Sequence, residues 1–91
     1  MNLIEDEDGA PYPEGVQAIA RERGRQITEL GYDAEHDAGH TAHDLMGMAL
    51  AYLGVAYWQP NGRVERPDLV KAGALVAAAI DRLDDEKVEA L

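Results

Sequence analysis

The sequence predicts a small all-α domain of about three helices. Apolar residues recur at helical spacing, Pro and Gly residues separate the periodic segments, and the length of 91 residues fits one domain. A chain of this length buries only about 60% of the surface that it exposes when unfolded, so we expect a small core. Cys is absent, which excludes disulfides and thiolate metal ligands.

The N-terminal segment, residues 1–12, is acidic and contains Gly and Pro. This composition is typical of a solvated, disordered arm. An acidic docking peptide is the alternative interpretation. We therefore expect a flexible arm over residues 1–12 and a helical domain over residues 13–91.

The first helix is expected over about residues 13–30, because Pro suits a first helical turn and Gly the position after a helix end. Its apolar residues lie three, four and seven positions apart, on one stripe. Arg23 falls on the same stripe, and a charge at an inward position needs a partner. Asp37 or Asp44 is expected to provide it, although an anion-binding role for Arg23 stays open.

Residues 31–40 are rich in Gly and Asp and are predicted to form a loop. Thr41 and Asp44 resemble a capping box, so the second helix is expected over residues 42–57. This helix is apolar on nearly all sides, which predicts burial against more than one neighbour. A three-helix monomer could hardly cover it, so we expect a homo-oligomer.

The third helix is expected over residues 67–84, after a turn with the sequence Gln-Pro-Asn-Gly. Its small residues, among them Ala72 and Gly73, permit the close approach of another helix. Gly24 in the first helix is a second place where a backbone could come close.

The chain is strongly acidic, with 18 acidic and 8 basic residues and a formal net charge of −10. This charge disfavours direct binding to nucleic acids or anionic membranes and favours a partner protein with a basic surface. The alternative is that acidity only keeps the protein soluble. The candidate acidic interaction surface comprises Glu5, Asp6, Glu7, Asp8, Asp84, Asp85 and Glu86.

The N-terminus lacks the basic start and apolar run of a signal peptide. The longest convincingly apolar stretch, residues 45–58, is too short to span a membrane. The expected location is therefore the cytoplasm.

A polar cluster around the end of the predicted loop is the main candidate for chemistry. Its histidines and nearby aspartate have the ligand types of Zn²⁺ or another divalent metal, so His36, His40, His43 and Asp44 are candidate metal ligands. The spacing matches no strong metal signature, and capping and turn formation are the competing interpretation.

A wider set of residues could bind an anion or a nucleotide. These candidates are Arg23, Gln26, Tyr32, His36, Asp37, His40 and Lys71. The sequence contains no phosphate-binding Gly-rich loop, no nucleophile elbow and no Cys/His pair, so no residue is assigned a catalytic role and no cofactor is required.

The chain resembles a group of small phage and prophage proteins of undefined function. The shared features are an Arg-x-Arg-Gln pattern, a Gly-aromatic pair, a His-Asp-x-x-His stretch and an Asp-Leu-Val-Lys-Ala-Gly-Ala-Leu helix followed by an acidic-Arg-Leu segment. They correspond here to Arg23, Arg25, Gln26, Gly31, Tyr32, His36, Asp37, His40, residues 68–75, Ile80, Asp81, Arg82 and Leu83. The resemblance covers roughly residues 20–84 and implies a phage-associated accessory role in a bacterial host. The chain departs from the group at Ala79, where Glu is common, and in a shorter turn over residues 58–66.

Three hypotheses follow. The first is a non-enzymatic phage accessory protein that inhibits a host nucleic-acid-binding defence complex, as small acidic anti-CRISPR-like proteins do. The second is a nucleotide- or metal-binding protein that uses the cluster of Arg23, His36, Asp37 and His40. The third is a structural component of a phage assembly.

Overall fold

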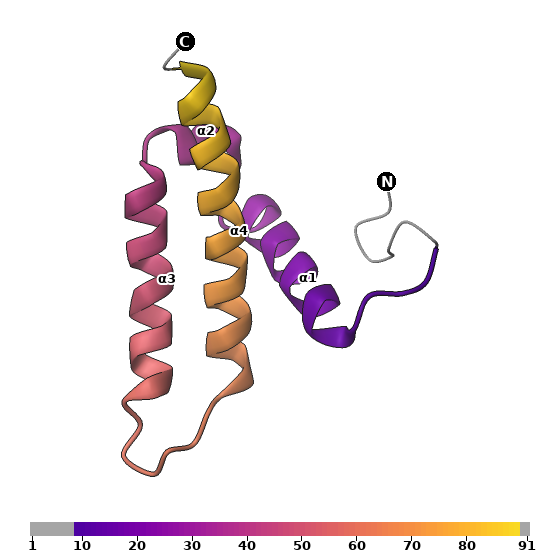
Figure 1. Ribbon diagram of the computed structural model, residues 1–91, viewed down its shortest axis with the longest axis vertical. Coiled ribbons are helices and arrows are strands. Elements are labelled where there is room, and N and C mark those ends of the chain that lie inside the picture. The colour runs from indigo at the N-terminus through magenta and orange to yellow at the C-terminus, as the bar shows by residue number, and fades with distance from the viewer. Residues whose placement is uncertain (1–8, 90–91) are drawn as a thin grey trace.

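The computed structural model describes residues 9–89, and in this range the chain forms four helices (Figure 1). Their bounds are Glu14–Thr28 for α1, Ala34–Ala38 for α2, Ala42–Tyr57 for α3 and Arg66–Glu89 for α4. The all-α fold is therefore confirmed, with one short helix more than predicted. None of the helices in the described residues is long and apolar enough to cross a membrane.

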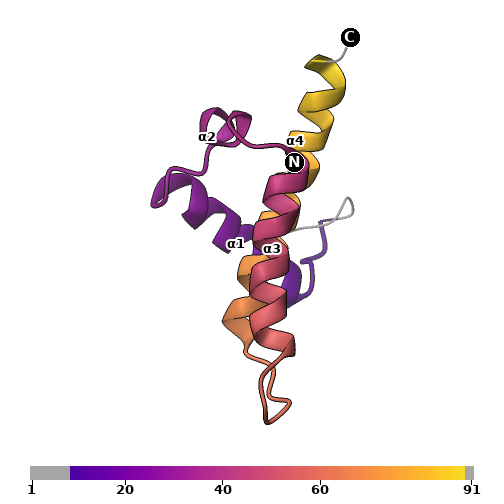
Figure 2. The ribbon, with the colours of Figure 1, turned by 90° about the vertical axis from the view of Figure 1, so that its left-hand side faces the viewer.

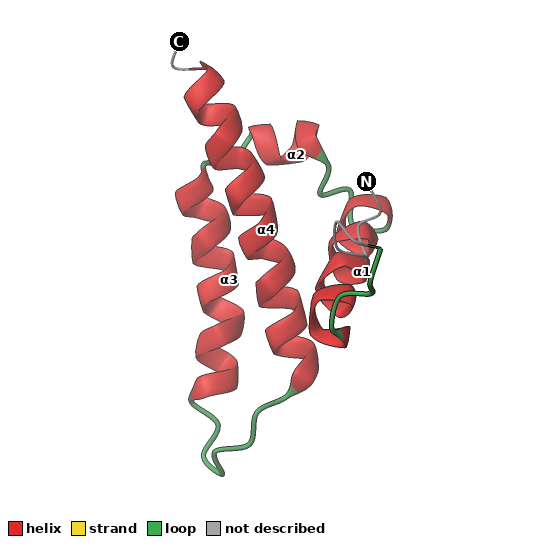
Figure 3. Ribbon diagram, turned by 45° about the vertical axis from the view of Figure 1, so that its right-hand side comes forward, coloured by secondary structure: helices red, strands yellow, loops and turns green. Residues whose placement is uncertain are grey.

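Helix α4 is the centre of the arrangement, since it packs against each of the other three helices. It forms an antiparallel hairpin with α3, while α1 crosses it on the side away from α3 (Figure 3). The short α2 lies near the end of the molecule where α3 begins and α4 finishes, as the side view also shows (Figure 2). This layout brings the loop before α3 next to the last turns of α4.

The N-terminal arm was predicted over residues 1–12, and residues 1–8 lie outside the described range. The remainder of the arm leads into α1, where the Gln17 side chain donates a hydrogen bond to the carbonyl of Tyr12 (2.7 Å). Helix α1 ends at Thr28, two residues earlier than predicted. The Tyr32 amide donates to the carbonyl of Gln26 (2.8 Å), and Gly31 takes a positive φ of 73°, so the chain turns away there.

The prediction of a loop over residues 31–40 is wrong in its middle, where α2 forms. Asp33 caps this helix, because its Oδ1 accepts a hydrogen bond from the His36 amide (2.9 Å). The Asp that suggested a turn therefore starts a helix. Five residues are too few to show an apolar period, so the pattern gave no sign of this helix.

The predicted capping box at the start of α3 is confirmed. Thr41 Oγ1 accepts from the Asp44 amide, and Asp44 Oδ2 accepts from the Thr41 amide, both at 3.0 Å. These hydrogen bonds lower the pKa of the Asp44 carboxyl below its ordinary value. Asp44 thus caps the start of α3 and is not the partner of Arg23.

Helix α4 extends five residues beyond the predicted end. Arg82 reaches along the last turns and pairs with both carboxylate oxygens of Glu89 at 3.1 Å each. The acidic residues 84–86, which oppose the helix dipole, therefore lie inside the helix rather than after it.

The core is built from small side chains. The buried apolar residues are Ala18, Leu45, Ala49, Ala56, Ala72, Ala74, Leu75 and Ala78. The predicted close approach at Gly73 is confirmed, since a Cβ built there would lie 2.6 Å from Cδ1 of Ile19 in α1. Gly24 plays no such part, because no atom lies within 4 Å of a Cβ built there.

Within one copy of the chain, α3 packs against one of the described helices, α4, so its burial against more than one neighbour stays a prediction. Only one face of α3 is buried, through Leu45, Ala49 and Ala56. Its larger residues Met46 and Leu50 are 53% and 65% exposed. The reason is geometric: Ala residues allow α3 and α4 to pack closely, and the bulky side chains point to the outside.

Candidate functional site

The Arg23 guanidinium joins α1 to the segment that contains α2. Its Nη2 lies 2.8 Å from Asp37 Oδ2, and its Nη1 donates to the carbonyl of Tyr32 at 2.8 Å. The two side chains are largely buried, with 15% of Arg23 and 8% of Asp37 exposed. The predicted pairing with Asp37 is therefore confirmed, and the alternative with Asp44 is wrong.

Three aromatic rings, those of Tyr32, His36 and His40, lie next to this ion pair. The Tyr32 ring stacks on the His36 ring with centroids 4.7 Å apart, and the His36 and His40 rings lie 5.0 Å apart. His36 Nδ1 lies 3.0 Å from Asp37 Oδ1. Both oxygens of Asp37 are thus engaged within the chain, one by Arg23 and one by His36.

Gln26 is buried, and its side chain hydrogen-bonds to Glu22 rather than to this cluster. Its Nε2 donates to Glu22 Oε2 (3.2 Å), and Arg25 binds both oxygens of Glu22 at 2.8 Å each. The hydrogen bond from Arg25 is the main reason why the pKa of Glu22 is lowered, with smaller contributions from Gln26 and Lys71. Gln26 Oε1 and Arg23 Nε are buried without a hydrogen-bond partner in the described part of the chain.

The structure does not bring Lys71 to the cluster. Its Nζ lies 5.8 Å from the centroid of the Tyr52 ring in α3, and its charge acts on Glu22 of α1. The predicted binding set is therefore split, with Lys71 apart from Arg23, Tyr32, His36, Asp37 and His40.

The candidate metal ligands do not converge either. His36 lies in α2, whereas His43 and Asp44 lie in the first turn of α3, where Asp44 is engaged in the capping box. Among residues 9–89, no group of three or more His, Cys, Asp or Glu side chains is arranged to hold a metal ion. The geometry gives the metal interpretation no support.

A second set of hydrogen bonds, which the sequence did not predict, holds the turn between α2 and α3 against α4. Arg82 Nε donates to the carbonyl of His40, and Glu86 Oε1 accepts from the Ala42 amide, both at 2.8 Å. Arg82 is buried and lies four and seven residues after Ala78 and Leu75, which are also buried. The same argument that singled out Arg23, a charge on an apolar stripe, could have found it.

Acidic side chains lie together at this end of the molecule. They come from α2, the start of α3 and the last turns of α4, and we call them the acidic pole: Glu35, Asp44, Asp81, Asp84, Asp85, Glu86 and Glu89. All are exposed except the half-buried Glu86. The candidate residues Glu5, Asp6, Glu7 and Asp8 lie outside the described range. The exposed Arg63 and Arg66 lie at the opposite end, beside the loop between α3 and α4.

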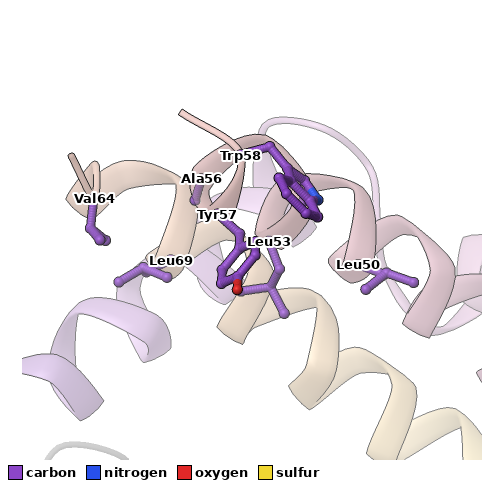
Figure 4. A pocket seen from close by; sticks show the side chains of 8 residues that line it. Leu50, Leu53, Ala56, Tyr57, Trp58, Val64 and Leu69 are labelled. Carbon is purple, nitrogen blue, oxygen red and sulfur yellow. The ribbon is translucent and has the colours of Figure 1, made fainter. Parts of the chain in front are cut away.

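Bulky apolar side chains line one face of the α3–α4 hairpin. This hairpin face comprises Met46, Leu50, Leu53 and Tyr57 of α3 with Leu69, Val76, Ile80 and Leu83 of α4. Their exposed fractions run from 40% for Leu53 to 75% for Tyr57. The face contains a hollow of about 370 Å³ near the loop, where Leu53, Tyr57 and Leu69 lie close together (Figure 4).

Comparisons of the chain with protein-family models, with curated proteins and with solved structures found no match. No activity, ligand or partner is therefore carried over from a relative.

Proposed function

We propose that the chain is a non-catalytic protein-binding module whose acidic pole docks on a basic surface of a partner protein. The observation that carries this proposal is the concentration of acidic side chains at one end of the molecule. Seven acidic side chains gather at one end, where Lys87 is the only exposed Lys or Arg among the described residues of α2, the start of α3 and the last two turns of α4. Such a concentrated field steers oppositely charged partners and sets specificity.

Arg23 is hydrogen-bonded to Asp37 and to the Tyr32 carbonyl, which supports a role of this residue cluster in folding rather than in ligand binding. A nucleotide phosphate would have to replace Asp37 and the Tyr32 carbonyl on Arg23, and both contacts are 2.8 Å long. Removing an anion from a largely buried Arg is costly unless the ligand restores every contact. The proposal therefore assigns no chemistry to this cluster.

The resemblance to small phage and prophage proteins, taken with the charge, leads us to propose a finer role. The partner would be a host protein or complex that normally binds nucleic acid, and the acidic pole would occupy its basic face. The chain would then act as an inhibitor of that complex, in the manner of an anti-CRISPR-like protein, in the bacterial cytoplasm.

The test is a pair of charge-reversal variants with the same change in net charge. Asp81→Lys/Asp85→Lys alters the acidic pole, whereas Glu14→Lys/Glu29→Lys, the α1 variant, alters exposed residues at the two ends of α1. When immobilised on an affinity column, wild type and the α1 variant should bind a nucleic-acid-binding host protein and displace the nucleic acid from it. The pole variant should neither bind this protein nor displace its nucleic acid. The binding should weaken as the salt concentration rises. Equal retention by both variants would overturn the proposal.

A further inference from the structure

We propose that the hairpin face is covered by a second copy of this chain, in an antiparallel four-helix bundle. This surface is separate from the acidic pole, so the inference goes beyond the proposed function. The spacing of the exposed side chains is the first argument.

On α3 the exposed residues of the face are 46, 50, 53 and 57, with steps of four, three and four. On α4 the residues 76, 80 and 83 repeat the same steps, and Leu69 lies seven positions before Val76. This is the spacing by which helices interdigitate along a seam in coiled coils and four-helix bundles. Both helices of the hairpin therefore present apolar side chains at this spacing to the same side, with a gap in α4 between Leu69 and Val76.

The two seams form one continuous surface. Met46 lines one hollow with Val76, Ile80 and Leu83, and Leu50 and Leu53 line another with Leu69. Leu50, Leu53 and Val76 meet in a third hollow between these two. The eight side chains are all apolar or aromatic, in a chain with a formal net charge of −10. A surface of this kind on a small acidic protein marks an interface.

The area fits a dimer of the chain. Helix α3 has 16 residues and is therefore about 24 Å long. Two helices side by side are about 20 Å wide, so the face measures about 500 Å². Two such faces bury about 1,000 Å² in total, which is the lower bound for a specific interface.

The charges at the two ends of the molecule favour a second copy of the chain as the partner, and they favour the antiparallel orientation. In the antiparallel arrangement, the last turns of α4 lie opposite the first turn of α4 in the partner copy. With Val76 next to the two-fold axis, Glu86 then comes level with Arg66 of the partner copy, and each contact occurs twice because the interface is two-fold. The parallel arrangement would bring the two acidic poles together, and like charges would repel.

The oligomeric state of two matched variants tests the proposal. Leu50→Asp places a charge in the middle of the face, and Val55→Asp places the same charge on the exposed opposite side of α3. Wild type and Val55→Asp should form dimers at micromolar concentration, and Leu50→Asp should raise the dimer Kd at least about 100-fold. Circular dichroism checks that Leu50→Asp stays helical. A monomeric wild type, or equal dimerisation of both variants, would overturn the proposal.

Cysteine cross-linking tests the orientation, since the chain has no Cys of its own. Under oxidation, Val76→Cys should form a disulfide with its own copy, because Val76 lies at the middle of the α4 seam, next to the two-fold axis. A mixture of Leu69→Cys and Leu83→Cys should form mixed disulfides, since a disulfide requires Cα atoms within about 7 Å. Self-linking of Leu83→Cys at the same rate as Val76→Cys would contradict the antiparallel arrangement.

Discussion

At the scale of single residues, two buried arginines hold the helices together. Arg23 fixes α1 to the α2 segment through Asp37 and the Tyr32 carbonyl, and Arg82 fixes the turn before α3 through the His40 carbonyl. Both lie on stripes of otherwise apolar residues. The sequence pointed to Arg23 and to Asp37 as one of two partners, because they lie close in the chain. It did not point to the contact between Arg82 and His40, which are 42 residues apart and meet only in the folded state.

Asp37→Ala should lower the free energy of unfolding by about 3 kcal/mol, because it leaves the largely buried Arg23 without its carboxylate. Urea denaturation at neutral pH measures this loss. Arg21→Ala is the matched control, since it breaks an exposed ion pair with Glu14 and should cost less than about 1 kcal/mol.

The double variant Arg23→Met/Asp37→Leu removes both charges and should recover most of the lost stability. That result would show that the pair acts in folding. If Asp37→Ala were as stable as wild type, the structural role of the pair would be wrong.

At the scale of elements, local signals predicted where most helices begin, but not which face of each is buried. The Thr41 capping box placed the start of α3 correctly. The apolar residues of α3 occupy nearly all sides, so their period could not distinguish the buried Ala49 from the exposed Leu50. The size of the side chains decides which of them is buried, because Ala49 packs with Ala72 and Leu75 of α4, and small side chains let the two helices approach closely.

Two Gly→Ala variants test this close packing. Gly24→Ala in α1 should raise the free energy of unfolding by about 0.5–1 kcal/mol, because it favours the helix and meets no neighbouring atom. Gly73→Ala in α4 should be no more stable than wild type, since its Cβ would lie 2.6 Å from Ile19 Cδ1 and 2.9 Å from Ile19 Cγ1, so the Ile19 side chain would have to shift. Thermal unfolding followed by circular dichroism compares them. An equal gain in both variants would show that α1 does not pack closely on α4.

At the scale of the whole molecule, the protein has too few large buried residues for its size and too many exposed ones. Its buried apolar set contains two Leu and six Ala residues, while the hairpin face leaves eight larger side chains in water. The sequence predicted a homo-oligomer from the apolar character of residues 42–57 alone. The contribution of α4 to the same face could not be predicted, because it depends on how the two helices are rotated in the hairpin.

The two proposed surfaces differ in their response to salt. Docking of the acidic pole on a basic partner is driven by opposite charges, so salt should weaken it. Pairing of the hairpin faces is apolar and opposed by the repulsion between two chains of charge −10, so salt should strengthen it. The two proposals can therefore be tested separately, and one can be contradicted while the other is confirmed.

Sedimentation equilibrium of the wild-type chain is the most direct measurement, at about 0.05 M and about 0.5 M NaCl. The fold leads us to expect a mass approaching 19.8 kDa, twice the monomer's 9.9 kDa, with a smaller dimer Kd at the higher salt. A mass of 9.9 kDa at every concentration and at both salt levels would contradict the pairing of the hairpin faces.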